Sequence, residues 1–144
     1  AMNDTYSYSA EAIGHVSLCR FNRVKLESLL DKFPKLERRL LAMASNELVQ
    51  AQDQMLLLGR KTASEKLCSF LLRLSDRAGS RGFDPSVVDL PMSRNDIGDY
   101  LGLTTETVSR TFTNLKKDNL IQILNGGKVR LIDREALQDM ADGV

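Results

Sequence analysis

The spacing of apolar and polar residues predicts a chain made mostly of helices, with short strands towards its C-terminal end. Between residues 93 and 117 the apolar positions follow helical spacing in two short runs that are separated by a turn. These runs predict two short helices, each with one buried side. The predicted inward residues are Ile97, Tyr100, Leu101, Val108, Phe112 and Leu115.

Capping and turn residues set the limits of the two helices. Ser93 can cap the first helix, and Asp96 three residues later completes a capping box. Gly102 ends it, because the sharp turn that follows needs a residue that tolerates positive φ. Thr104 caps the second helix. Gly98 has no side chain, which predicts a close approach of the second helix to the first.

The outward residues at the start of the second helix allow two interpretations. They are Thr105, Glu106, Ser109 and Arg110. In an ordinary helical hairpin, Glu106 and Arg110 would form a surface ion pair that contributes ~0.3–0.5 kcal/mol. In a DNA-reading helix-turn-helix, residues at this place contact bases. Arginine can then form two hydrogen bonds to guanine O6 and N7, and glutamate can accept one from cytosine N4.

A long helix is predicted upstream, opened by Phe33-Pro34 and free of further proline or glycine until Gly59. Six of its residues follow steps of 3, 4, 3, 4 and 3, the a/d pattern of a coiled coil. We call them the heptad seam: Leu41, Ala44, Leu48, Ala51, Met55 and Leu58. The pattern predicts pairing with a second copy of the chain. The alternative is a helix that packs on its own domain.

Weaker patterns predict the remaining elements. Residues 6–21 alternate and suggest one or two short strands, although two strands alone bury too little to be stable. A hairpin is predicted around Asn125-Gly126-Gly127, and Asp133 would cap a last helix. The predicted ranges are a helix at 22–31, a helix at 62–76, a loop at 77–85, a strand at 87–90, strands at 119–123 and 128–132, and a helix at 134–140.

Composition limits the class of protein. The chain has 144 residues, 42% of them hydrophobic and 27% charged, which fits one domain or a small domain with an attached element. A net charge of +1 does not by itself predict a nucleic-acid binder. Cys19 and Cys68 lack metal-ligand spacing, which favours free thiols in a reducing compartment. With no membrane-length apolar run and no signal-peptide pattern, a cytoplasmic location is predicted.

No pattern in the sequence predicts catalysis. The chain has one histidine, His15, which excludes most hydrolase and metal schemes. Its Gly-Gly pair lies in a predicted hairpin turn rather than in a phosphate-binding loop after a strand. We therefore predict that the protein is not an enzyme.

The segment DIGDYLGLTTETVSRTFTNLKKDNLI resembles the C-terminal DNA-binding part of the CRP/FNR family of bacterial transcription regulators. Glu106, Ser109 and Arg110 match the Glu-x-x-Ser-Arg signature of the FNR and FixK branch. The resemblance continues upstream through residues 33–83, so it covers nearly the whole chain.

The resemblance implies a mainly α fold with a small β component (α+β), in which a long dimerisation helix precedes a winged helix-turn-helix domain. Residues 1–32 would be a remnant of an N-terminal sensor β-roll and a short helix, 33–60 the dimerisation helix, and 61–144 the DNA-binding domain. The predicted hairpin would be the wing. The chain would then be a fragment of a longer regulator or a naturally shortened relative.

The resemblance also implies a function, that of a homodimeric regulator on a palindromic TTGAT-type site. Its partners would be double-stranded DNA, a second copy and RNA polymerase, without a membrane. The base-reading residues would be Thr105, Glu106, Ser109 and Arg110. The phosphate contacts would be Ser93, Arg94, Thr107, Lys116 and Lys128. Two alternatives remain: a protein-interaction module that uses the same helices, and a ligand sensor on N-terminal strands that are too few to enclose a pocket.

Cys19 bears on whether a cofactor is expected. In FNR-like proteins with an iron–sulfur cluster, a cysteine at a similar position is one ligand, and three more lie near the N-terminus. Those three have no counterpart here, and a cluster needs a full ligand set. We therefore predict no cofactor and interpret Cys19 as a small buried strand residue.

Overall fold

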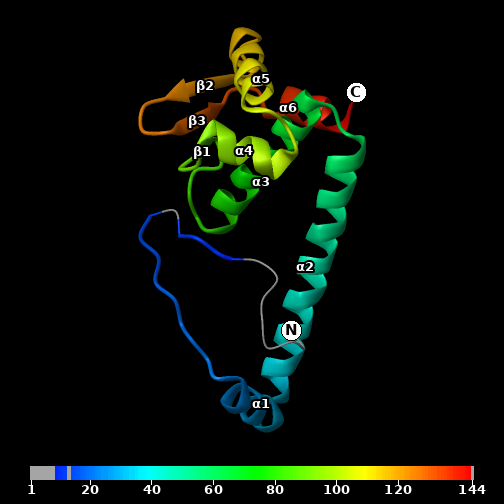
Figure 1. Cartoon of the computed structure of the whole chain (residues 1–144), viewed down its shortest axis with the longest axis vertical. Coiled ribbons are helices and arrows are strands. Elements are labelled where there is room, and N and C mark those ends of the chain that lie inside the picture. The colour runs from blue at the N-terminus through cyan, green and yellow to red at the C-terminus, as the bar shows by residue number, and fades with distance from the viewer. Residues whose placement is uncertain (1–8, 13, 144) are drawn as a thin grey trace. The chain divides into compact units, whose positions relative to one another are not determined.

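The structure is a computed structural model that describes residues 9–12 and 14–143 (Figure 1). Its elements are α1 (Arg23–Lys32), α2 (Pro34–Arg60), α3 (Ala63–Ser80), β1 (Val87–Asp89), α4 (Arg94–Leu101), α5 (Thr105–Lys117), β2 (Ile121–Leu124), β3 (Lys128–Leu131) and α6 (Arg134–Asp142). The chain divides into two compact units, and the division between Asn46 and Glu47 falls inside α2. The predicted fold class, mainly α with a small β component, is confirmed. The three-part division at residues 32 and 60 stays a prediction.

The first unit contains α1, which begins where predicted. The Asn22 side chain caps it by accepting from the Val24 backbone N–H at 3.0 Å. None of its residues is buried, and Val24 is 72% exposed. The strands predicted at 6–21 are wrong for residues 9–12 and 14–21, which form no strand and include an exposed Cys19. A strand needs partners, and the described residues offer it none; residues 6–8 and 13 lie outside the described ranges.

Helix α2 confirms the predicted long helix and continues one residue past Gly59. Pro34 occupies its first position, where a missing N–H costs nothing. All six residues of the heptad seam are exposed in the single chain. Leu57, which lies just before the last seam position, is instead only 3% exposed and belongs to the core of the second unit.

Helix α3 starts at a capping box between Thr62 and Glu65 and buries Cys68, as expected for a core residue. It ends at Ser80, four residues later than predicted. The loop prediction for 77–80 is wrong because one tertiary and one local hydrogen bond hold these residues in the helix. Arg77 Nη2 donates to Gln50 Oε1 of α2 at 3.0 Å. Ser80 Oγ donates to the Arg77 carbonyl.

The three strands form one antiparallel sheet in the order β1-β3-β2. Central strand β3 pairs Val129 with Val88 on one side and with Ile123 on the other. The predicted hairpin is confirmed, with Gly126 and Gly127 at φ of 73° and 72°. Figure 1 shows this hairpin beside α5, which packs against β2.

One core joins the sheet to the helices of the second unit. Helix α6 packs on α3 through buried Leu137 and Ala141, and the Asp133 side chain caps it as predicted. Together these contacts place α4, α5 and the β2–β3 hairpin on a common support. This is the arrangement of a winged helix-turn-helix.

Candidate nucleic-acid interface

The turn between α4 and α5 depends on two glycines. Gly102 adopts φ 63° and ψ 44°, the left-handed conformation predicted for a residue that ends α4. The Leu103 N–H donates to the Gly98 carbonyl at 2.8 Å. A Cβ on Gly98 would lie 2.6 Å from the Leu103 carbonyl oxygen. The close approach predicted at Gly98 is therefore present. The segment that lies against Gly98 is the backbone of the turn between the two helices.

The buried side of the helix pair agrees with the sequence pattern at five of six positions. The residues that are at most 2% exposed are Ile97, Leu101, Val108, Phe112 and Leu115. Tyr100 is the exception, at 46% exposed. Its ring lies against Phe70 at a centroid distance of 5.6 Å, and its hydroxyl accepts from Arg73 at 3.2 Å. Tyr100 therefore lies at the edge of the buried side of the helix pair, in contact with α3.

The predicted base-reading residues share the first turns of α5. Glu106, Ser109 and Arg110 are exposed, and Thr105 is partly exposed. Three ion pairs occur among the described residues, and Glu106–Arg110 is not one of them. The ion-pair interpretation of these two residues is therefore wrong for this structure. Neither side chain forms a hydrogen bond within the described ranges, so both are available to a ligand.

Arg94 is the first residue of α4. Its guanidinium carbon is 3.4 Å from the centroid of the Phe112 ring, which makes a cation–π contact between α4 and α5. Partial burial lowers the pKa of Arg94, although the group remains a cation at neutral pH. The stacking fixes the plane of the guanidinium and leaves its N–H edge for an anion.

Ser93 and Thr107 take part in helix capping. Ser93 Oγ donates to Asp96 Oδ2 at 2.7 Å and accepts from the Asp96 N–H at 3.2 Å. Hydrogen bonds from Ser93 lower the pKa of Asp96, because they favour the carboxylate. Thr104 Oγ1 lies 3.0 Å from Thr107 Oγ1 and accepts from the Thr107 N–H. Both predicted phosphate contacts thus already have partners within the protein.

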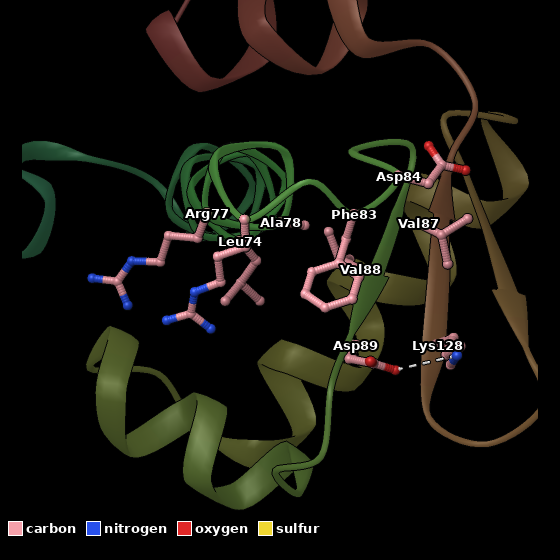
Figure 2. Close-up of a pocket in the computed structure, with 10 residues that line it drawn as sticks. Leu74, Arg77, Ala78, Phe83, Asp84, Val87, Val88, Asp89 and Lys128 are labelled. Carbon is pink, nitrogen blue, oxygen red and sulfur yellow. Dashed lines mark ion pairs between the residues drawn. The ribbon is translucent and has the colours of Figure 1, made fainter. Parts of the chain in front are cut away.

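Lys116 and Lys128 are exposed cations at the end of α5 and the start of β3. Lys128 Nζ lies 3.8 Å from Asp89 Oδ1, as the dashed line in Figure 2 shows. The pair borders a hollow of about 440 Å³ between the end of α3 and β1. A phosphate at Lys128 would compete with Asp89 for the ammonium group.

A hydrogen-bond chain that the sequence analysis did not identify connects α4 to α5. Asn95 Nδ2 donates to Asp99 Oδ2 at 3.2 Å, and Thr105 Oγ1 donates to Asn95 Oδ1 at 3.0 Å. The i,i+4 spacing of Asn95 and Asp99 is a sequence signal for the first bond. The second bond joins two helices and has no such signal.

A second network attaches the C-terminal part of α2 to α4. Gln54 Nε2 donates to the Tyr100 carbonyl at 3.2 Å, and Arg73 Nη1 donates to Gln54 Oε1 at 3.1 Å. Leu58 of the heptad seam reaches the turn, because a Cβ on Gly102 would lie 3.5 Å from Leu58 Cδ2. All of these residues belong to the second unit.

Two features are absent from the described residues and bear on other kinds of site. No helix in that part of the chain is long and apolar enough to cross a membrane. No group of three or more His, Cys, Asp or Glu side chains there could hold a metal ion.

Comparisons with known proteins agree on one family. Residues 65–140 match the Crp-like helix-turn-helix domain. The nitrogen fixation regulation protein FixK of Bradyrhizobium diazoefficiens is 43% identical over 140 residues, which are 97% of this chain and 59% of FixK. The transcriptional activatory protein AadR of Rhodopseudomonas palustris is 44% identical over 141 residues, which are 98% of this chain and 59% of AadR.

The structural comparison gives the same result. The structure of FixK2 from Bradyrhizobium japonicum superposes with a TM-score of 0.74 at 41% identity, and the match covers 82% of this chain and 58% of that one. The chain thus spans slightly less than three fifths of the length of these relatives. Members of this family regulate transcription and are not enzymes, in agreement with the sequence prediction. The chain belongs to the CRP/FNR family and, within it, to the FixK-like regulators.

Proposed function

We propose that the chain is a homodimeric, sequence-specific DNA-binding regulator of transcription that binds a palindromic site with TTGAT half-sites facing ATCAA across a short spacer. One observation carries the proposal. Glu106, Ser109 and Arg110 are exposed on the second helix of a winged helix-turn-helix, at the place where such helices contact bases.

Arg110 and Glu106 are the proposed base readers. Arg110, which has no hydrogen-bond or ion-pair partner among the described residues, can form two hydrogen bonds to guanine O6 and N7. Glu106, one helical turn earlier, can accept from cytosine N4 and orient Arg110 once DNA is bound. Ser109 lies beside Arg110 and can contact a thymine. Thr105 precedes Glu106 and is the fourth residue of the proposed reading surface.

The proposed phosphate contacts differ in what supports them. Arg94 has a guanidinium held in place by Phe112 with its N–H edge available. Lys116 is an exposed cation on the reading helix. Lys128 has to break its ion pair with Asp89 before it can bind a phosphate. The proposal for Ser93 and Thr107 rests on position, because the Ser93 hydroxyl already caps α4 and the Thr107 hydroxyl already accepts from Thr104 Oγ1.

The proposed dimer uses the heptad seam. Leu41, Leu48 and Met55 are 70%, 60% and 71% exposed in the single chain, which is a large apolar area to leave in water. The a/d spacing would cover these side chains in a paired helix. Two copies of the reading helix would then enter successive major grooves, ~34–36 Å apart, and read a symmetric site.

RNA polymerase completes the proposed set of partners. AadR is a transcriptional activator by its name, and activation implies a contact with the transcription machinery. A protein-interaction module without DNA reading is the competing proposal. The exposed Glu106 and Arg110 favour DNA, because both suit base edges.

The decisive experiment measures affinity for a TTGAT palindrome and for a scrambled duplex of equal length, at several salt concentrations. Arg110→Ala should reduce affinity for the palindrome by ~1–3 kcal/mol and have a smaller effect on the scrambled duplex. Lys116→Ala is the matched control, since it removes the same charge from the same helix. It should weaken both duplexes equally. Equal losses on both duplexes for Arg110→Ala would remove that residue from base reading.

A further inference from the structure

The hydrogen-bond chain Asp99–Asn95–Thr105 fixes the orientation of the Asn95 side-chain amide. The carboxylate oxygens of Asp99 can only accept hydrogen bonds. The Asn95 atom that lies 3.2 Å from Asp99 must therefore be the amide nitrogen. The other end of that amide, which faces Thr105 at 3.0 Å, is then the carbonyl oxygen.

This orientation determines what the Thr105 hydroxyl can do. A carbonyl oxygen only accepts, so the hydroxyl must donate its single proton to Asn95. It has no second proton for thymine O4, guanine O6 or guanine N7, which are all acceptors. Fixing Oγ1 on Asn95 also fixes the side-chain rotamer, and hence the direction of the methyl group.

We propose that Asn95, oriented by Asp99, is a positioning residue that makes Thr105 read DNA through its methyl group. The preferred base contact of Thr105 is then the C5-methyl of a thymine. This inference rests on the proposed function and specifies one of its contacts. Asn95 itself touches no base in this scheme.

The geometry supports this assignment over a polar contact. Thr105 is partly exposed at the first position of α5, directly before exposed Glu106. An apolar contact between a threonine methyl and the thymine methyl is one of the standard readings in the major groove. The remaining polar possibility is that the Thr105 hydroxyl accepts a hydrogen bond from adenine or cytosine. Replacing thymine by deoxyuridine distinguishes that contact from a methyl contact.

The experiment replaces each thymine of the TTGAT palindrome by deoxyuridine, one symmetric pair at a time, and measures affinity for the full chain. Deoxyuridine keeps every hydrogen-bonding group and lacks only the methyl. At one thymine the wild-type chain should lose about threefold to fivefold in affinity per half-site, the value for one buried methyl group. Thr105→Ser, which lacks the methyl, should show no loss at that thymine.

Variants in the chain itself test the role of Asn95. Asn95→Ala frees the Thr105 hydroxyl and should reduce the discrimination between thymine and deoxyuridine. Thr105→Val keeps a methyl and has no hydroxyl, so it should retain the discrimination. Adding Asn95→Ala to Thr105→Val should then change nothing further.

Exchanging the side chains at positions 95 and 99 should rescue the discrimination between thymine and deoxyuridine. In the double variant Asn95→Asp and Asp99→Asn the net charge is unchanged, and the new carboxylate at 95 can accept from both Thr105 and the new amide at 99. It should restore the wild-type discrimination that Asn95→Ala loses. Asp99→Asn alone lets the Asn95 amide turn over and should reduce the discrimination.

The outcomes separate this inference from the proposed function. If the palindrome is preferred over scrambled DNA and no thymine is sensitive to deoxyuridine, the methyl reading is wrong and DNA binding stands. If Asn95→Ala lowers affinity equally for thymine and deoxyuridine, Asn95 has only a structural role. If the palindrome is not preferred at all, the proposed function itself fails.

Discussion

Gly98 lies so close to Leu103 that a Cβ atom on the glycine would be 2.6 Å from the Leu103 carbonyl oxygen. The same two residues are joined by a hydrogen bond from the Leu103 N–H to the Gly98 carbonyl. The turn between α4 and α5 is therefore built against a residue that has to remain glycine.

We expect Gly98→Ala to destabilise the second unit. Alanine is the better helix former by about 1 kcal/mol, but the added methyl group must push the turn backbone away, at a cost of about 1–3 kcal/mol. Urea unfolding followed by circular dichroism should show a lower midpoint. Gly59→Ala in α2 is the matched control, because nothing lies within 4 Å of its Cβ position. A variant of Gly98 as stable as that control would contradict the close approach.

The heptad seam can be tested with two neighbouring residues of α2. Leu48 and Val49 are 60% and 55% exposed, so neither contributes to the core of the single chain. Only Leu48 is a seam residue. Leu48→Asp should shift the protein from dimer to monomer in sedimentation or light scattering, and Val49→Asp should leave the dimer intact. Identical behaviour of the two variants would exclude the seam as the interface.

The helix pair and the wing could be predicted because their signals are local. Caps at Ser93 and Thr104, a glycine at the turn and an Asn-Gly-Gly hairpin each determine backbone geometry within a few residues. The apolar positions of α5 follow one period, and all three predicted inward residues are buried. Such features need no knowledge of distant parts of the chain.

The features that sequence reasoning missed depend on distant partners. Leu57 stands in a run of large apolar residues, and only tertiary packing decides that it enters the core. The end of α3 was predicted too early because the bond from Arg77 to Gln50 crosses 27 positions. The chain from Asp99 to Thr105 joins two helices whose crossing has to be known first.

Salt dependence should distinguish phosphate contacts from base contacts. Lys116→Ala should reduce the slope of log affinity against log salt by about one per chain, or about two for the proposed dimer, because each chain loses one phosphate contact and fewer counterions are released. Lys32→Ala in α1 removes another exposed lysine, which lies outside the second unit. That control should leave the slope unchanged. A slope unaffected by Lys116→Ala would exclude a phosphate contact for this residue.

The buried thiol of Cys68 predicts a loss of stability in alkali. Burial raises the pKa of Cys68 from 9.0 to about 11, and a smaller opposing effect comes from Lys61. Between these values the unfolded chain has released the proton and the folded chain still holds it, so stability falls as pH rises through this window. Below pH 9 the thiol is protonated in both states and contributes nothing to the pH dependence.

Urea unfolding at pH 7, 9 and 10.5 measures this effect. The decline between pH 9 and 10.5 should be steeper for the wild-type chain than for Cys68→Ala, by at most about 1.4 kcal/mol for each pH unit of that interval. Cys19→Ser alters an exposed thiol and should follow the wild type. Parallel curves for the wild type and Cys68→Ala would show that Cys68 ionises equally in both states.

The tip of the hairpin is tied to the end of β1, because the Leu90 N–H donates to the Gly127 carbonyl at 2.7 Å. A hairpin held at its turn cannot flex to follow a wider or narrower groove. On the proposed interface, the duplex has to make that adjustment by changing its own shape. Base pairs beneath the wing should then influence affinity through their stiffness, without any contact to their edges.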